Sequence, residues 1–401
     1  MEGATEIITY SFIFLTLYFE VFLLISFLER KPEEQGEFAP KVTVLIPCYN
    51  EERTISQTID SVLALDYPKE SYSIIVINDG STDGTGSRLK RYQSFPNIRI
   101  YSKPNGGKHT ALNLGLEKTE TDFVGCLDAD SFVRPYALRN IMARFAEDSV
   151  MAVTPSTIVA KPRKLIQHMQ KAEYHYGNFV RQAMFLIGAI HIAPGPFSFF
   201  RKEVFDKIGP YDFAHNTEDM EIAMRMQRHG MKIAHAHDAV VETVGPNTLR
   251  KLYKQRVRWV SGFFGNLIDY RFMLFNRSYG PLGLVVLPLS LVGIFLTIPF
   301  VLANLWSAAS SLQNYFYKLY FAGWPGLDFD IFFVDTSALS MLMILLSAVL
   351  ILMLAYSRKL TAGRWKFTFD FAYLFLYAFV APFWLAKAIY NNALRRKTAW
   401  R

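Results

Sequence analysis

Four apolar stretches constrain this chain more than any other feature of its sequence. Residues 7–28 read IITYSFIFLTLYFEVFLLISFL, a run long enough to cross the hydrocarbon core of a bilayer as a helix. Similar stretches lie near residues 281–306, 337–356 and 369–390. A signal peptide explains the first stretch less well, because no basic region precedes it and no small-residue cleavage site follows it. The pattern predicts an integral membrane protein.

A mostly polar region separates the first apolar stretch from the other three. It is long enough for an ordinary globular domain. At its carboxyl end, the segment TLRKLYKQRVRWVSGFFGNLIDYRFMLF is basic, aromatic and amphipathic, as expected of a helix at a membrane surface. Residues 164–188 have a similar pattern. The sequence thus divides into a membrane helix, a globular domain, amphipathic interface helices with the QRVRW motif and a membrane region, at residues 1–30, 31–248, 249–280 and 281–401.

Basic residues beside the apolar stretches predict an orientation, because such residues stay in the cytosol. The first ten residues contain no Lys or Arg, whereas Arg30 and Lys31 follow the first stretch. We therefore expect an external N-terminus and a cytosolic globular domain, in a protein of the cell membrane. The basic tail at 393–401 conflicts with four full spans, which would leave it outside. A re-entrant or hairpin-like segment at 281–306, which contains three prolines, would resolve the conflict.

Charge and cysteine content narrow the class of partner. The net charge is +8, and much of it lies in RKLYKQRVRW and beside the apolar stretches, which favours an anionic membrane surface or a phosphate substrate. We expect no nucleic-acid partner, because no recognition module is present. The two cysteines, Cys48 and Cys126, have no metal-type spacing and indicate no disulfide framework, which fits a reducing compartment.

The globular region alternates strand and helix patterns. Four apolar strand patterns, each followed by polar residues, read KVTVLIPC, YSIIVIND, IRIYSK and TDFVGCLD. This alternation predicts a doubly wound α/β sheet, in which ligands bind beyond the carboxyl ends of the strands. The polar residues at three of these ends are Tyr49, Asn50, Glu51, Asn78, Asp79, Asp128 and Asp130.

Two acidic motifs have both a structural and a functional interpretation. Asp128 and Asp130 end one strand as D-A-D, a suitable pair of oxygen ligands for Mg²⁺ or Mn²⁺ beside a diphosphate, although such triplets also occur by chance. Glu218 and Asp219 follow Thr217, a candidate N-cap of a helix, so they either stabilise the positive end of that helix or include a catalytic base.

The order of motifs resembles the family 2 membrane glycosyltransferases, which include the cellulose, chitin, hyaluronan and poly-N-acetylglucosamine synthases. NGGKHTALN and the position of TED are most similar to the last of these. The resemblance spans residues 42–262 and rests on IPCYNE, NDGSTDGT, NGGKHTALNLGL, DADS, PGPFSFFRKEVFDKIGPYD, TED and QRVRW.

The resemblance implies a GT-A type fold inserted between transmembrane helices, and a site that binds a UDP-sugar. Tyr49 and Glu51 would contact the uracil and ribose, and Asp79 would lie beside the base. Lys108 would face the nucleotide, although a solvated loop lysine is the alternative. The remaining donor-side residues would be Asp128 at the ribose or diphosphate, Asp130 at the metal, and Gln255 and Arg258 at the diphosphate.

The resemblance also implies an inverting reaction. Asp219 would be the general base, with Glu218 beside it, raising its pKa through like charge. Trp259 would stack on the acceptor sugar, and Gly195 belongs to the same acceptor region. The expected product is a β-linked polysaccharide, made from a UDP-N-acetylglucosamine or UDP-glucose type donor, and export coupled to synthesis is a further expectation. The expected partners are the donor, a glycan or lipid-linked acceptor, the bilayer, and a second copy or an accessory membrane subunit.

Three functions remain open at this point. QRVRW is typical of processive synthases, whereas the small number of spans favours addition of one sugar to a lipid-linked acceptor. A catalytically inactive scaffold is the third, and the intact set of acidic motifs argues against it.

Overall fold

The structure is a computed structural model that describes residues 2–28, 38–323, 337–361 and 370–394. Its α/β part contains eight strands in one sheet. The strands are β1 (Val42–Cys48), β2 (Tyr72–Asp79), β3 (Ile98–Lys103), β4 (Phe123–Cys126), β5 (Ser131–Val133), β6 (Val150–Val159), β7 (Ser198–Arg201) and β8 (Lys232–Thr243). The helices between them are α2 (Ile55–Leu63), α3 (Thr85–Leu89), α4 (Lys108–Glu117), α5 (Ala137–Arg144), α6 (Leu165–Leu186), α7 (Glu203–Ile208) and α8 (Glu218–Arg228).

The sheet has two halves of different topology. Its strand order is β3-β2-β1-β4-β7-β6-β8-β5, and the first four strands run parallel. These are the four strands expected from the sequence, and every residue of β1 is buried, as in parallel sheets covered on both faces. Beyond β4 the sheet is mixed. There β7 is antiparallel to both neighbours, β8 is parallel to β6, and β5 is antiparallel to β8.

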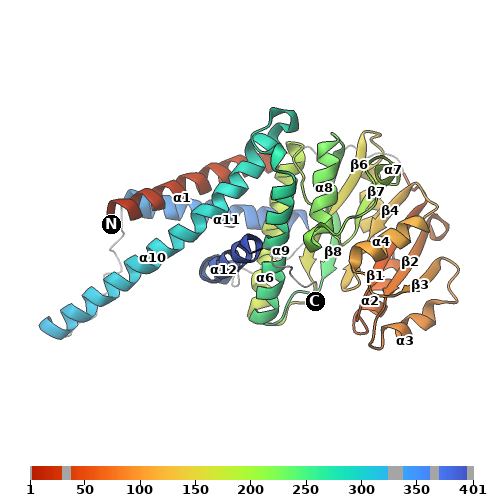
Figure 1. Cartoon of the computed structure of the whole chain (residues 1–401), viewed down its shortest axis with the longest axis horizontal. Helices are drawn as coiled ribbons and strands as arrows, with labels where there is room; N and C mark the ends of the chain where they lie inside the picture. Colours follow the sequence, from red (N-terminus) through yellow and green to blue (C-terminus); the bar gives the residue numbers. More distant parts are fainter. Residues whose placement is uncertain (1, 29–37, 324–336, 362–369, 395–401) are drawn as a thin grey trace.

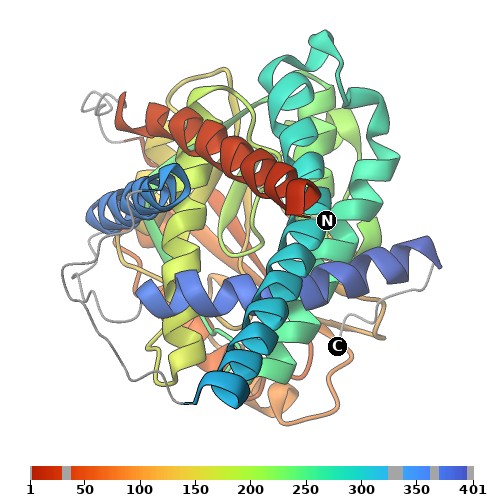
Figure 2. The same cartoon turned by 90° about the vertical axis from the view of Figure 1, so that its left-hand side faces the viewer.

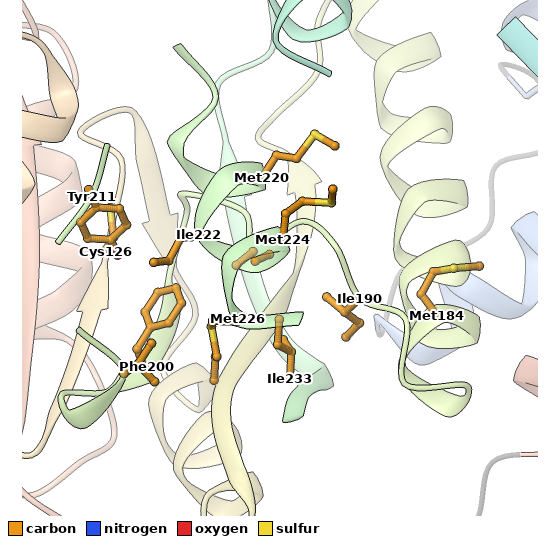
Figure 3. Packing of buried hydrophobic residues seen from close by; sticks show 14 of the residues in the cluster. Cys126, Met184, Ile190, Phe200, Tyr211, Met220, Ile222, Met224, Met226 and Ile233 are labelled. Atoms are coloured by element: carbon orange, nitrogen blue, oxygen red, sulfur yellow. The ribbon is translucent and has the colours of Figure 1, made fainter. Parts of the chain in front are cut away.

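Helices cover both faces of the sheet. One apolar cluster joins side chains of α2 and α5 to one face, and a second joins α4, α6 and α8 to the other. In the second cluster, Met220, Met224 and Met226 of α8 lie among side chains from the sheet and from the α6 region, including Phe200, Ile233, Met184 and Ile190 (Figure 3). The packing of these methionines anchors α8, whose first turn carries the TED motif.

The apolar stretches form the helices α1 (Glu2–Leu23), α10 (Leu287–Ala322), α11 (Ala338–Leu360) and α12 (Asp370–Ala393). Three of these extend away from the α/β part, while the fourth, α12, lies against α6 and α9 (Leu249–Asp269) (Figure 1). Among the described residues, Leu282–Ala322 and Ala338–Lys359 are long and apolar enough to cross a membrane, and Ile7–Leu23 is a shorter apolar helix. Viewed from this end, α1 and α12 both cross α10, and α12 passes behind it (Figure 2).

No hairpin interrupts the second apolar stretch. A π-helical turn at Leu282–Val286 leads directly into α10, which continues through Pro299 for 36 residues. The alternative of a re-entrant 281–306 is therefore wrong. Pro281 and Pro288 fall near the start of the helical segment, where a missing N–H costs little. Residues 395–401, which hold most of the basic tail, lie outside the described residues.

Two amphipathic helices connect the sheet to the membrane-type helices. They are α6 and α9 (Leu249–Asp269), which cover the two segments expected to be interfacial helices. The α6 helix contacts β6, α11 and α12, whereas α9 contacts α12 and the 3-10 turn Ala214–Asn216. In Figure 1 they stand side by side between the sheet and the apolar helices. The α9 helix thus links the apolar helices to the segment just before TED.

Candidate active site

Hydrogen bonds join the loop after β1 to the loop after β2. The backbone N–H of Glu51 donates to the Thr85 hydroxyl at 2.8 Å, and the Glu51 carboxylate accepts from the Thr54 hydroxyl at 2.8 Å. Asn50 accepts from the backbone N–H of Thr82 at 2.8 Å. Tyr49 follows directly on the end of β1. These bonds hold Asn50 and Glu51 at the carboxyl edge of the parallel half, where the uridine contacts are expected.

Asp79 is buried at the end of β2, and its carboxylate is fully engaged. It forms a 2.7 Å ion pair with Lys103 at the end of β3. It also accepts from the backbone N–H groups of Gly106 at 3.1 Å and Gly107 at 2.9 Å. We call Asp79, Lys103, Gly106 and Gly107 the donor-side cluster. The cluster fixes the start of α4, where Gly107 has a φ of 92°, a conformation that favours glycine.

Lys108, the first residue of α4, joins two of the expected acids. Its Nζ lies 2.7 Å from Asp128 Oδ1 and 2.7 Å from Glu218 Oε1. A solvated loop lysine is therefore the wrong interpretation of Lys108. Gly195 lies against this group, because a Cβ at that position would approach Lys108 Nζ to 2.6 Å and both Asp128 oxygens to 3.0 Å. Only glycine fits there without movement.

Asp219 completes this group in the first turn of α8. Its Oδ1 accepts from the backbone N–H of Met220 at 3.0 Å, and its carbonyl accepts from the N–H of Ala193 at 3.0 Å. We call Lys108, Asp128, Glu218 and Asp219 the base-side cluster. Lys108, Glu218, Asp219 and Gly195 also line one small cavity.

The two acids of TED differ in proton affinity. Burial and the neighbouring Glu218 carboxylate raise the pKa of Asp219 to about 6. Burial alone would also raise the pKa of Glu218, but the charge and hydrogen bond of Lys108 hold it below its usual value. As expected, the charge of Glu218 raises the pKa of Asp219, although burial raises it more. Asp219 can thus exchange a proton near neutral pH while Glu218 stays ionised.

Thr217 occupies the N-cap position of α8 without capping it through its side chain. The hydroxyl donates instead to the Ala214 carbonyl at 3.0 Å and accepts from the Asn266 amide at 2.9 Å. The expected side-chain cap is therefore wrong, because α9 engages the hydroxyl.

Asp130 lies in the turn between β4 and β5, two residues beyond Asp128. The Ser131 hydroxyl donates to its carboxylate at 3.4 Å, and its carbonyl accepts from the N–H of Val244 at 3.1 Å. Within the described ranges, no group of three or more His, Cys, Asp or Glu is placed to hold a metal ion. One or two carboxylates still suit Mg²⁺ or Mn²⁺, since substrate phosphates commonly supply the other ligands. Asp130 therefore fits as a metal ligand.

The QRVRW motif lies on α9, and its residues have different surroundings. Arg258 donates to the Asn216 carbonyl at 3.0 Å, and its charge lowers the proton affinity of Glu218 and Asp219. The Gln255 Oε1 atom is buried and has no hydrogen-bond partner among the described residues. Trp259 is 36% exposed, and the Arg256 guanidinium lies over its ring, 4.2 Å from the centroid.

The sequence analysis missed Lys103 and the partners of Arg256. Arg256 is buried and pairs with Glu173 of α6 at 2.5 Å, and the Tyr377 hydroxyl of α12 donates to Glu173 at 2.7 Å. Arg256 was visible inside the motif, but Glu173 and Tyr377 are distant in sequence and carry no motif. Lys103 directly opposes Asp79 in the register of β2 and β3, so the pair becomes evident only when that register is known.

Comparison with known proteins identifies the part of the chain that carries the donor-side cluster. Residues 43–209 match the family model described as Glycosyl transferase family 2. The chain carries a family 2 glycosyltransferase domain. The match ends before TED and QRVRW. The arrangement of Glu218, Asp219 and α9 is therefore supported by the contacts described above and not by this match.

Curated relatives match a longer part of the chain. It is 33% identical over 261 residues to a poly-beta-1,6-N-acetyl-D-glucosamine synthase of Staphylococcus aureus (strain COL), and 29% identical over 261 residues to that of Staphylococcus epidermidis. The alignments cover 62% of this chain in both cases, and 62% and 63% of the two relatives. The chain therefore matches less than two thirds of the length of either relative.

A solved structure supports the fold over nearly the whole chain. The mannosyltransferase PcManGT from Pyrobaculum calidifontis, in complex with GDP-Man and Mn²⁺, superposes with a TM-score of 0.64. The sequences are 22% identical, and the match covers 96% of this chain and 99% of that one. The chain therefore has a GT-A type glycosyltransferase fold with appended apolar helices.

Proposed function

We propose that this chain is an inverting membrane hexosyltransferase that extends a β-linked polysaccharide from a UDP-sugar. The base-side cluster is the observation that carries the proposal. It holds three carboxylates around one ammonium group, and Asp219 has a pKa of about 6. The likeness to poly-beta-1,6-N-acetyl-D-glucosamine synthases supports UDP-N-acetylglucosamine as the donor.

In the proposed reaction, Asp219 accepts the proton of an acceptor hydroxyl. The hydroxyl oxygen forms a bond to the anomeric carbon of the donor sugar, while the bond from that carbon to the diphosphate breaks on the opposite face. UDP leaves with the electron pair, and the proton stays on Asp219. A single displacement inverts the anomeric centre, so an α-linked donor yields a β-linked product.

Other residues of this chain bind and orient the substrates in our proposal. Tyr49 and Glu51 contact the uridine, Asp79 lies beside the base, and Lys108 and Asp128 face the donor. Asp130 holds Mg²⁺ or Mn²⁺, which when bound supplies positive charge for the departing diphosphate. On α9, Gln255 and Arg258 contact the diphosphate and Trp259 stacks on the acceptor sugar beside Gly195. The unpartnered Gln255 Oε1 atom supports a ligand contact at that position.

We also propose where the protein is located and what it binds. The apolar helices cross the cell membrane, the glycosyltransferase domain faces the cytosol where UDP-sugars are made, and a lipid bilayer surrounds α10 and α11. A second copy of the chain or an accessory membrane subunit could assist export of the product. The length and apolar character of Leu282–Ala322 and Ala338–Lys359 support the membrane assignment.

Sizing of products made from radiolabelled UDP-N-acetylglucosamine tests the function. Membranes with the full chain should release UDP and produce long, β-linked, label-containing chains. EDTA should stop the reaction, and Mn²⁺ or Mg²⁺ should restore it. One-sugar lipid products would favour single addition to a lipid-linked acceptor, and full activity after exhaustive chelation would contradict the metal assignment. No transfer from any UDP-sugar would overturn the proposal.

A further inference from the structure

The turn before α8 has an unusual backbone. Ala214, His215 and Asn216 have φ values of 45°, 54° and 63°, which place three successive residues in the left-handed region. None of them is glycine, the residue that adopts this region at little cost. Such conformations persist only where the surrounding structure holds them, and they are concentrated at functional sites. The base of the proposed reaction lies three residues after this turn.

The α9 helix supplies three polar contacts that hold the turn. Asp269 bonds to His215 Nε2 at 2.8 Å, and Arg258 donates to the Asn216 carbonyl at 3.0 Å. The buried Asn266 amide donates to the hydroxyl of Thr217 at 2.9 Å. These contacts lie along one face of α9 and reach successive residues of the segment that leads into α8.

Two glycines on the same face of α9 permit this close approach. A Cβ at Gly262 would meet the Thr217 side chain, and a Cβ at Gly265 would meet the His215 ring, in both cases closer than 3.0 Å. Neither glycine has a positive φ, and both are inside a helix, where glycine is less favourable than alanine. Contact with the turn therefore accounts for both glycines.

We propose that Gly262, Gly265 and Asn266 are positioning residues, which hold residues 214–217 against α9 and thereby fix Asp219 for catalysis. The inference rests on the proposed function, in which Asp219 is the base. The α9 helix is itself tied to α6 and α12 through Arg256, Glu173 and Tyr377. The position of the base thus depends on how the amphipathic and apolar helices pack, and not on the sheet alone.

Alanine substitutions of the two glycines test this role in the full chain. Gly262→Ala and Gly265→Ala should each lower kcat by about 10²-fold, because displacement of a reacting group by about 1 Å costs that much. The donor KM and UDP affinity should change much less than kcat, because the donor-side cluster is bonded within itself at β2, β3 and the start of α4, and α9 adds only the proposed diphosphate contacts of Gln255 and Arg258. Gly177→Ala is the matched control: it also adds a methyl group inside a helix, but nothing lies within 4 Å of its Cβ.

A second substitution tests whether the contact itself is responsible. His215→Gly removes the ring that a Cβ at position 265 would meet, and glycine adopts the same φ freely. Because His215→Gly also removes the bond to Asp269, the reference is His215→Gly alone. In that background Gly265→Ala should lower kcat about ten-fold less than it does in the wild type. The same loss in both backgrounds would contradict a clash at the turn.

The outcomes separate the inference from the proposed function. Unchanged kcat in Gly262→Ala and Gly265→Ala, beside an inactive Asp219→Asn, would overturn the positioning role and leave the base assignment intact. Equal losses of kcat and UDP affinity would also overturn it, since they indicate general damage to the fold. Wild-type turnover in Asp219→Asn would overturn the proposed function and the inference together.

Discussion

The donor-side and base-side clusters adjoin at the start of α4, yet they balance charge differently. Asp79 has a lysine and two backbone N–H groups as partners, so its charge is compensated within the protein. In the base-side cluster, Lys108 pairs with two carboxylates while Asp219 lies beside them as a third. The first cluster is complete without a ligand, whereas the second carries excess negative charge.

This difference indicates that the two clusters have different roles. A compensated, buried ion pair holds backbone in place, and it keeps the glycine loop ready for the donor. Burial and neighbouring negative charge raise the proton affinity of one carboxyl group in the second cluster, which suits proton transfer. We expect the largest effect from a change in the base-side cluster, a smaller one from a change in the donor-side cluster, and the smallest from a change on α9.

Asp219→Asn should lower kcat by about 10²–10⁴-fold, because the amide keeps the shape of the side chain but cannot accept a proton. UDP affinity should stay near the wild-type value, since the donor-side cluster is intact. Turnover and calorimetric UDP binding, measured on one preparation, check both statements. Asp206→Asn, at an exposed site on α7, is the control and should leave both unchanged.

Asp79→Asn should act on stability and on donor binding. Loss of the carboxylate removes the ion-pair partner of Lys103, so we expect the free energy of unfolding to fall by about 3 kcal/mol. UDP binding should weaken, while the pH dependence of the remaining turnover should not change. Denaturant unfolding and UDP titration measure the first two. The exposed pair of Asp60 and Arg91 provides a contrast, because Asp60→Asn should cost less than about 1 kcal/mol.

Unaltered stability and UDP affinity in Asp79→Asn would mean that the donor-side cluster does not organise the glycine loop. The donor-side cluster would then have no structural role to set against the catalytic role of the base-side cluster.

Trp259→Ala should affect the acceptor more than the donor. Loss of the ring removes a surface for the acceptor sugar, so elongation should fall about ten-fold more than UDP-sugar hydrolysis, which needs no acceptor sugar. Both activities are measured on the same membranes. Trp306→Ala, at an exposed position on α10, should change neither. Equal losses of elongation and hydrolysis would discard the acceptor role and the main argument for processivity.

Much of the site followed from the sequence because parallel strands end at one edge of a sheet. That rule alone places Asp79 and Asp128 at the same edge, and the motif order adds Lys108 and Glu218. Lys108 contacts both Asp128 and Glu218. The mixed half of the sheet did not follow from the strand patterns, because antiparallel pairing in that half joins strands far apart in the chain.

Other features depend on contacts that no local pattern encodes. The 214–216 turn contains no glycine to mark its left-handed backbone, and the complementary glycines, Gly262 and Gly265, lie on another helix. Prolines suggested a break in the second apolar stretch, but α10 continues through Pro299. In each case tertiary packing decides the local conformation, so residues that are adjacent in sequence do not predict it.

The pH dependence of kcat in the wild type and in Glu218→Gln tests the central claim most directly. Asp219 must be deprotonated to act as a base, so wild-type kcat should fall as the pH drops through about 6. Glu218→Gln removes a negative charge beside Asp219 and frees Lys108 to stabilise its carboxylate, so the acidic limb should move down by about one pH unit. Each profile is normalised to its own plateau. The same acidic limb in both proteins would contradict the account.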